Sequence, residues 1–129
     1  SEKDRTNIEK TFEALMQLVK ELTEEESRYI REGFASDEEL AIFDLLKRDN
    51  PNKADITKLK GTATEMFSKI TEAISKMDHW ADKDETTAEI QNLIRDILWR
   101  ELPECYDDRL IEICRGDVFE YVYTRYGHA

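Results

Sequence analysis

Apolar residues recur at alternating steps of four and three near the start of the chain, at Ile8, Phe12, Leu15, Val19 and Leu22. Because an α-helix has about 3.6 residues per turn, this spacing places all five side chains on one stripe of a helix. A similar spacing returns within residues 56–77. Only four glycines and two prolines interrupt the 129 residues, so long helices can continue unbroken. The sequence therefore predicts an all-α fold, a single helical domain of five to six helices over residues 1–129.

Capping residues and helix breakers predict where the helices end. Thr23 and Ser36 are each followed three residues later by glutamate, the pattern of a capping box. Gly33 and Gly127 suit helix exits, and Pro103 ends the helix before it. The expected helices cover residues 6–22, 23–32, 36–48, 55–77, 82–101 and 107–126. The last helix is expected to turn these apolar residues inward: Leu110, Ile113, Cys114, Val118, Tyr121 and Val122.

The charge of the chain is strongly negative and unevenly distributed. The formal net charge is −11 at pH 7. This value disfavours a stand-alone nucleic-acid binder or a protein of anionic membrane surfaces, because both depend on Lys and Arg. Residues 1–46 and 70–129 each carry a net charge of −7, whereas residues 47–69 carry +3. No apolar run is long enough for a transmembrane helix, so we expect no contact with a membrane.

Sequence patterns for catalysis and cofactor binding are missing. The four glycines lie at least eleven residues apart, so no glycine-rich loop can cradle a phosphate. Neither histidine has a histidine or cysteine at zinc-ligand spacing. No acidic residue is followed two positions later by lysine, an arrangement common in metal-dependent nucleases. We therefore predict no catalytic residue, no metal site and no cofactor in this chain.

The two cysteines, Cys105 and Cys114, are nine residues apart. On one helix they could not reach each other to form a disulfide. Reduced thiols and a cytoplasmic location are the simpler interpretation.

The basic stretch contains the only plausible contacts to phosphate. Its candidates are Lys47, Arg48, Lys53, Lys58 and Lys60. A solvated helix face explains such residues as well as a phosphate-facing patch does, and both interpretations stay open. Stacking on single-stranded bases is doubtful, because Phe67 is the one aromatic residue available there.

Aromatic residues gather in the second half of the chain. On the last expected helix, Tyr121, Tyr123 and Tyr126 cover more than one face, so they cannot all point into one core. Tyrosine and tryptophan are enriched at protein interfaces. We therefore predict a docking surface that includes Trp99, Tyr121, Tyr123 and Tyr126, while core and rim packing remains the alternative.

Several segments together resemble a known family. The most specific pattern is Glu38-Glu39-Leu40-Ala41-x-Phe43-Asp44 with Trp80 downstream, supported by residues 13–22, 31–37 and 83–98. The further segments are Leu102-Pro103, Tyr106-Asp107 and Val118-Phe119-x-x-Val122-Tyr123-x-x-Tyr126. Over most of residues 9–126 the chain resembles the C-terminal region of the motor and restriction (R) subunit of type I restriction–modification enzymes. One departure from the pattern is Ile42 before Phe43.

The resemblance implies a role that periodicity alone does not. In this family the R subunit carries a nuclease domain and helicase-like ATPase domains, which would lie upstream of this chain and use ATP and Mg²⁺. The implied partners are the methyltransferase and specificity subunits, the subunit's own upstream helical and motor domains, and DNA. We therefore expect a non-catalytic assembly domain that docks the R subunit onto the methyltransferase core. The alternative is a stand-alone acidic helical adaptor or regulatory protein with no DNA role.

Overall fold

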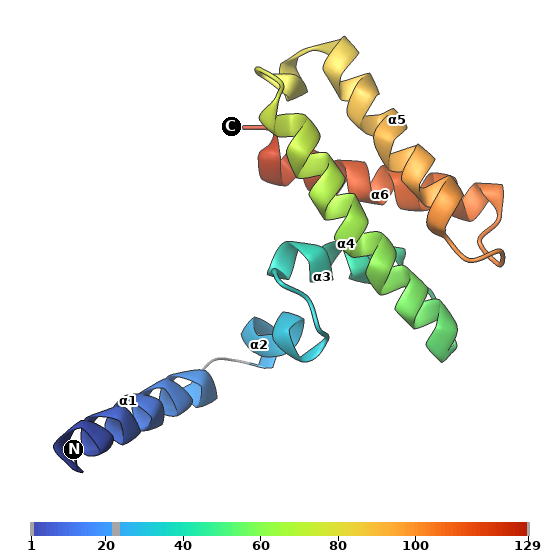
Figure 1. Cartoon of the computed structure of the whole chain (residues 1–129). Helices are drawn as coiled ribbons and strands as arrows, with labels where there is room; N and C mark the ends of the chain where they lie inside the picture. Colours follow the sequence, from blue (N-terminus) through green and yellow to red (C-terminus); the bar gives the residue numbers. More distant parts are fainter. Residues whose placement is uncertain (1, 22–23, 129) are drawn as a thin grey trace. The chain divides into compact units, whose positions relative to one another are not determined.

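The structure is a computed structural model that describes residues 2–21 and 24–128 (Figure 1). Within these ranges the chain forms six α-helices and one short 3₁₀ helix, and no strand. The all-α prediction is confirmed. The chain divides into two compact units, an N-terminal unit of residues 1–37 and a C-terminal unit of residues 38–129.

The N-terminal unit contains α1 (Glu2–Glu21) and α2 (Glu24–Arg31). The helix α1 begins earlier than expected, and the carboxylates of Glu2 and Asp4 in its first turn suit the positive end of the helix dipole. The expected cap at Thr23 lies outside the described residues.

The end of α2 is a Schellman motif. The N–H of Gly33 donates to the carbonyl of Ile30 (3.0 Å), and the N–H of Phe34 donates to that of Tyr29 (2.9 Å). Gly33 has φ of 87°, which glycine adopts without the strain that a Cβ would bring. The predicted helix exit at Gly33 is confirmed.

The C-terminal unit contains α3 (Asp37–Leu46), α4 (Lys53–Ser75), the 3₁₀ helix η1 (Trp80–Asp82), α5 (Asp84–Glu101) and α6 (Asp108–Tyr126). The helix α4 begins two residues earlier than expected, because the side chain of Asn52 accepts a hydrogen bond from the N–H of Asp55 (2.8 Å). Asp107 caps α6 in the same way, through the N–H of Leu110 (2.9 Å).

Three long helices and α3 supply the core of this unit, and α5 contacts α4, α6 and η1 (Figure 1). The buried apolar side chains of α4 and α5 are Leu59, Ala63, Met66, Ile70, Ile90, Ile94, Ile97 and Leu98. Those of α3 and α6 are Leu40, Ile42, Phe43, Leu46, Ile111, Cys114, Val118 and Val122. Burying one such large side chain contributes about 1.5–3 kcal/mol.

One inward face was predicted wrongly at its start. Ile113 is 44% exposed, whereas Ile111 is buried at 4%. Ile111 continues the row formed by Cys114, Val118 and Val122 at helical spacing, and Ile113 lies off that row. The start of α6 is therefore rotated relative to the prediction.

Two long-range hydrogen bonds tie loops and helix ends to the core. The hydroxyl of Tyr106, between α5 and α6, donates to the carbonyl of Leu46 at the end of α3 (2.6 Å). The indole N–H of Trp80 donates to the carbonyl of Tyr126 at the end of α6 (3.1 Å). The chain turns sharply before η1, where His79 has φ of 50°.

Candidate functional site

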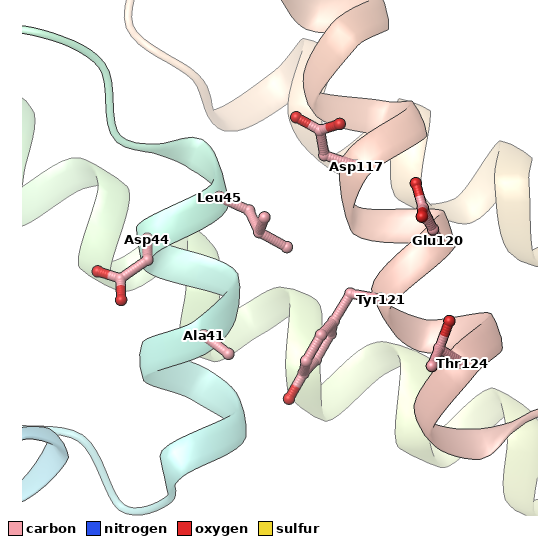
Figure 2. Close-up of a pocket in the computed structure, with 7 residues that line it drawn as sticks. All are labelled: Ala41, Asp44, Leu45, Asp117, Glu120, Tyr121 and Thr124. Atoms are coloured by element: carbon pink, nitrogen blue, oxygen red, sulfur yellow. The ribbon is translucent and has the colours of Figure 1, made fainter. Parts of the chain in front are cut away.

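A hollow of about 530 Å³ lies between α3 and α6 (Figure 2). We call it the α3–α6 groove, and its lining residues are Ala41, Asp44, Leu45, Asp117, Glu120, Tyr121 and Thr124. In Figure 2 the side chains of Ala41, Leu45 and Tyr121 point into the space between the two helices. Three of the lining residues are acidic and none is basic. The groove thus combines an apolar floor with a negative charge.

Ion pairs join α3 and α6 at both ends of this groove. Beyond Leu45, the guanidinium of Arg48 lies 3.8 Å from the carboxylate of Asp117. At the other end, the guanidinium of Arg125 pairs with Glu38. The pKa of Glu38 lies below its usual value, chiefly through a hydrogen bond from its own backbone N–H and further through Arg125. These pairs join the two walls of the groove at its ends.

The four predicted docking residues do not form one surface. Tyr121 lines the α3–α6 groove, and together with Tyr126 it lines an adjoining hollow near Glu38 and Arg125. Tyr123 instead packs with Trp80, with ring centroids 6.1 Å apart at 81°. Trp99 is 53% exposed on α5 and lines neither hollow. The structure brings two of the four together.

The sequence interpretation missed most of the groove. Ala41 and Leu45 on α3 face Asp117, Glu120 and Tyr121 across a separation of more than 70 residues in the sequence. Neither helix shows a local pattern that predicts the other as its neighbour. The one available signal was Tyr121, which the sequence assigned both to the inward face of the last helix and to a docking surface; in the structure it is partly buried.

Among the predicted DNA-binding residues, Arg48 has a structural role. Its guanidinium donates to the carbonyls of Leu45 (2.8 Å) and Lys47 (3.1 Å), which end α3. The same group reaches the Sγ of Cys114 (3.3 Å) in addition to Asp117. A phosphate would have to compete with these contacts for Arg48.

The four lysines of the predicted patch have different surroundings. Lys58 lies 3.6 Å from the carboxylate of Glu101. The ammonium groups of Lys47 and Lys60 each lie 5.9 Å from the ring centroid of Phe43, within the range of a cation–π interaction. Lys53 is exposed at the first turn of α4. Lys47 and Lys60 are therefore neighbours, and contact of this region with DNA stays a prediction.

The apolar stripe of α1 exists as predicted, and no described residue of its own unit covers it. Ile8, Phe12, Leu15 and Val19 are 54–69% exposed, and α1 has no buried residue. Leu22, the last predicted member, lies outside the described residues. A shallow hollow of about 390 Å³ on this face is lined by Asn7, Ile8, Thr11, Phe12 and Leu15. Large apolar surfaces of this kind commonly mark interaction sites.

The two cysteines of the chain have different surroundings. Both cysteines are free; Cys105 is exposed and Cys114 is buried. Burial raises the pKa of the Cys114 thiol, which disfavours the reactive thiolate.

Among residues 2–21 and 24–128, no group of three or more His, Cys, Asp or Glu side chains could hold a metal. None of the helices described could span a bilayer.

Comparison with known proteins connects this fold to a family. A family model for the C-terminal part of type I restriction enzyme HindI endonuclease subunit-like proteins matches residues 3–119. The curated proteins and the solved structures give no match. The matched span runs from the start of α1 into α6, so it covers most of each unit. The chain belongs to the family of C-terminal domains of type I restriction enzyme HindI endonuclease subunit-like proteins.

Proposed function

We propose that this domain docks the endonuclease subunit onto the methyltransferase core of a type I restriction enzyme. The observation that carries the proposal is the exposed apolar stripe of α1, because a helix with this pattern gains most of its stability by covering that face. The partners would be the methyltransferase and specificity subunits, together with the upstream domains of the same subunit.

The charge of the chain supports a protein partner. With a formal charge of −11, the domain would be steered toward a basic surface, which raises the association rate and discriminates against acidic partners. Catalysis would belong to the upstream nuclease and motor domains with their ATP and Mg²⁺. The domain itself would act by binding, in the cytoplasm with the other subunits.

The test is capture of the purified methyltransferase core by the immobilised chain, with Leu15→Asp as the altered chain and Gln17→Asp as its control. Both substitutions add one carboxylate to an exposed position of α1. Leu15 lies on the apolar stripe, and Gln17 lies about 200° around the helix from it. We expect Leu15→Asp to reduce capture at least about tenfold, the effect of losing about 1.4 kcal/mol of binding, whereas Gln17→Asp should leave it unchanged.

Deleting this domain from the whole subunit is a stricter test of the docking function than capture by the isolated chain. Removing residues 1–129 should abolish assembly with the methyltransferase core and, with it, restriction in cells. If assembly and restriction both persist, the docking function is refuted. The stand-alone adaptor would then be favoured, and it also predicts no DNA binding at low salt.

We propose DNA contact as a secondary role of the basic region. Its support is the net charge of +3 over residues 47–69 and the proximity of Lys47 to Lys60 around Phe43. Replacing Lys53, Lys58 and Lys60 with Glu should weaken DNA binding and flatten its dependence on salt, because fewer counterions are released. An unchanged salt slope would dismiss this region as a phosphate contact.

A further inference from the structure

The α3–α6 groove remains open although both of its walls belong to the folded core. On α3, Leu40, Phe43 and Leu46 are buried, which holds the opposite face of the helix in place. On the groove side, the small side chain of Ala41 lies across from the ring of Tyr121 (Figure 2). A methyl group opposite an aromatic ring leaves room for an incoming side chain.

An ion pair lies at each end of the groove. The pair Arg48–Asp117 lies at one end, and the pair Glu38–Arg125 at the other. Arg48 is further held by the carbonyl of Leu45 and by Cys114. Side-chain contacts at both ends thus join α3 and the residues just after it to α6.

The charges of the groove select the kind of occupant. Asp44, Asp117 and Glu120 line it, and Asp117 pairs with Arg48. In Figure 2, Asp117 lies at one end, Glu120 on the α6 wall, and Asp44 on the outer side of α3. Counted with the ion pairs at its two ends, the groove keeps more acidic than basic side chains, and this excess repels phosphates and attracts lysine or arginine. Nucleic acid is therefore an unsuitable ligand, and a basic protein segment is a suitable one.

We propose that the α3–α6 groove binds a helical segment of a partner protein that presents one apolar side chain flanked by lysine or arginine. A helix carries residues three and four positions apart on one face, so basic side chains can surround a central apolar anchor. The anchor enters between Ala41, Leu45 and Tyr121, and a cation meets Glu120 on the α6 wall. This inference rests on the proposed docking function and assigns it a second contact, apart from α1.

The direct test uses synthetic helical peptides and the full 129-residue chain. The probe has one leucine with lysines three and four positions to either side. Two comparison peptides replace the lysines with glutamate or the leucine with serine. We expect the probe to shift backbone NMR resonances of α3 and α6, and each comparison peptide to bind at least about tenfold more weakly. Equal binding of all three peptides, or shifts confined to other helices, would overturn the proposal.

Variants of the chain locate the contact. Glu120→Lys reverses a charge of the groove, and Glu89→Lys makes the same change at an exposed position on α5. We expect only Glu120→Lys to weaken the probe, by about threefold to tenfold. Ala41→Trp should fill the hollow and abolish binding, and Glu120→Lys remains informative if that variant does not fold. Equal affinity of the two lysine variants would contradict the proposal.

Capture of the methyltransferase core separates this inference from the docking function. Reduced capture by Glu120→Lys relative to Glu89→Lys supports the groove as a contact of the assembly. Equal capture by both refutes it there, while docking through another surface stands. If the wild-type chain captures no core but the groove still binds the probe, the docking function fails and the groove's selectivity is upheld. A concentration-dependent dimer that Glu120→Lys disrupts would identify a second copy as the occupant and overturn the choice of partner.

Discussion

The helices α1 and α4 carry nearly the same apolar pattern and have opposite surroundings. Leu59, Ala63, Met66 and Ile70 follow steps of four, three and four along α4, and all are at most 1% exposed. Ile8, Phe12, Leu15 and Val19 follow the same steps along α1 and are more than half exposed. Periodicity therefore specifies a helix and its apolar face, but it does not specify what covers that face.

The different exposure of the two apolar faces also means that they contribute differently to the stability of the folded chain. The face of α4 is covered by other helices of its own unit, so its apolar residues contribute to folding. The face of α1 contributes little until a partner covers it, because the hydrophobic effect follows the area removed from water. The apolar side chains of α4 thus contact other helices of their unit, whereas those of α1 would be buried only if a partner covered them.

Matched leucines give the largest expected contrast. Leu59→Ala should lower the free energy of unfolding by about 2–5 kcal/mol, since a buried side chain is removed and a cavity remains. Leu15→Ala, the same change at a side chain that is 56% exposed, should change it by less than about 0.5 kcal/mol. Urea unfolding followed by circular dichroism measures both. Similar losses for the two variants would show that α1 is covered in solution and would remove the contrast.

Matched tyrosines test the polar contacts in the same way. The hydroxyl of Tyr106 donates to the carbonyl of Leu46 in a buried position, whereas Tyr29 on α2 is only partly buried. Tyr106→Phe should lower the free energy of unfolding by about 1–2 kcal/mol, because the carbonyl loses its partner. Tyr29→Phe should have little effect, and thermal unfolding distinguishes the two. A negligible loss in Tyr106→Phe would mean that water replaces the hydroxyl.

Alkaline pH provides a second readout of Tyr106. Burial, the largest cause, raises the pKa of this phenol from 10 to about 12. The protonated form is thus favoured in the folded chain, so its contribution is complete below pH 10 and is lost as pH rises toward about 12. The wild-type chain should lose stability over this interval more steeply than Tyr106→Phe. Parallel curves for the two chains would show that Tyr106 does not titrate in this way.

Alanine substitutions at two glycines, one in each unit, should change stability by smaller amounts and in opposite directions. Gly61 lies within α4 with no atom near the position of an added Cβ, so Gly61→Ala should raise the free energy of unfolding by about 0.5–1 kcal/mol. Gly33 has open space as well, but its φ of 87° is strained for alanine, so Gly33→Ala should weaken the end of α2 by about 1 kcal/mol. Denaturant unfolding measures the first change, and amide hydrogen exchange in α2 measures the second. A gain at both positions would show that backbone conformation matters less than helix propensity.

Much of the fold could be predicted because helices depend on local signals. The exit at Gly33 and the stop at Pro103 follow from neighbours within a few turns. Helix starts were less accurate. The helix α4 was expected from residue 55, yet the side chain of Asn52 caps it and it begins at Lys53.

The candidate site was largely beyond prediction because it depends on contacts between distant segments. Arg48 was assigned to a phosphate-facing patch, and only the fold shows Cys114 and Asp117 beside it. Ala41 and Glu120 are far apart in the sequence, and only the fold places α3 across from α6. Charge counted along the sequence cannot reveal such pairs, since ion pairing depends on distance in space.

The smallest expected effect is on stability at acid pH, through the ion pair between Glu38 on α3 and Arg125 on α6. A glutamate on α1 serves as the matched control. The pKa of Glu38 is lowered from 4.5 by its own backbone N–H and by Arg125. A lowered pKa contributes stability that is present above the unfolded value and is lost as pH falls through the folded value. Between about pH 5 and pH 3 the wild-type chain should therefore lose about half a kcal/mol more than Glu38→Gln, a modest amount because the carboxylate is partly exposed. The control Glu13→Gln on α1 should leave the acid limb unchanged, and equal acid limbs for all three chains would show that this pair does not stabilise the fold.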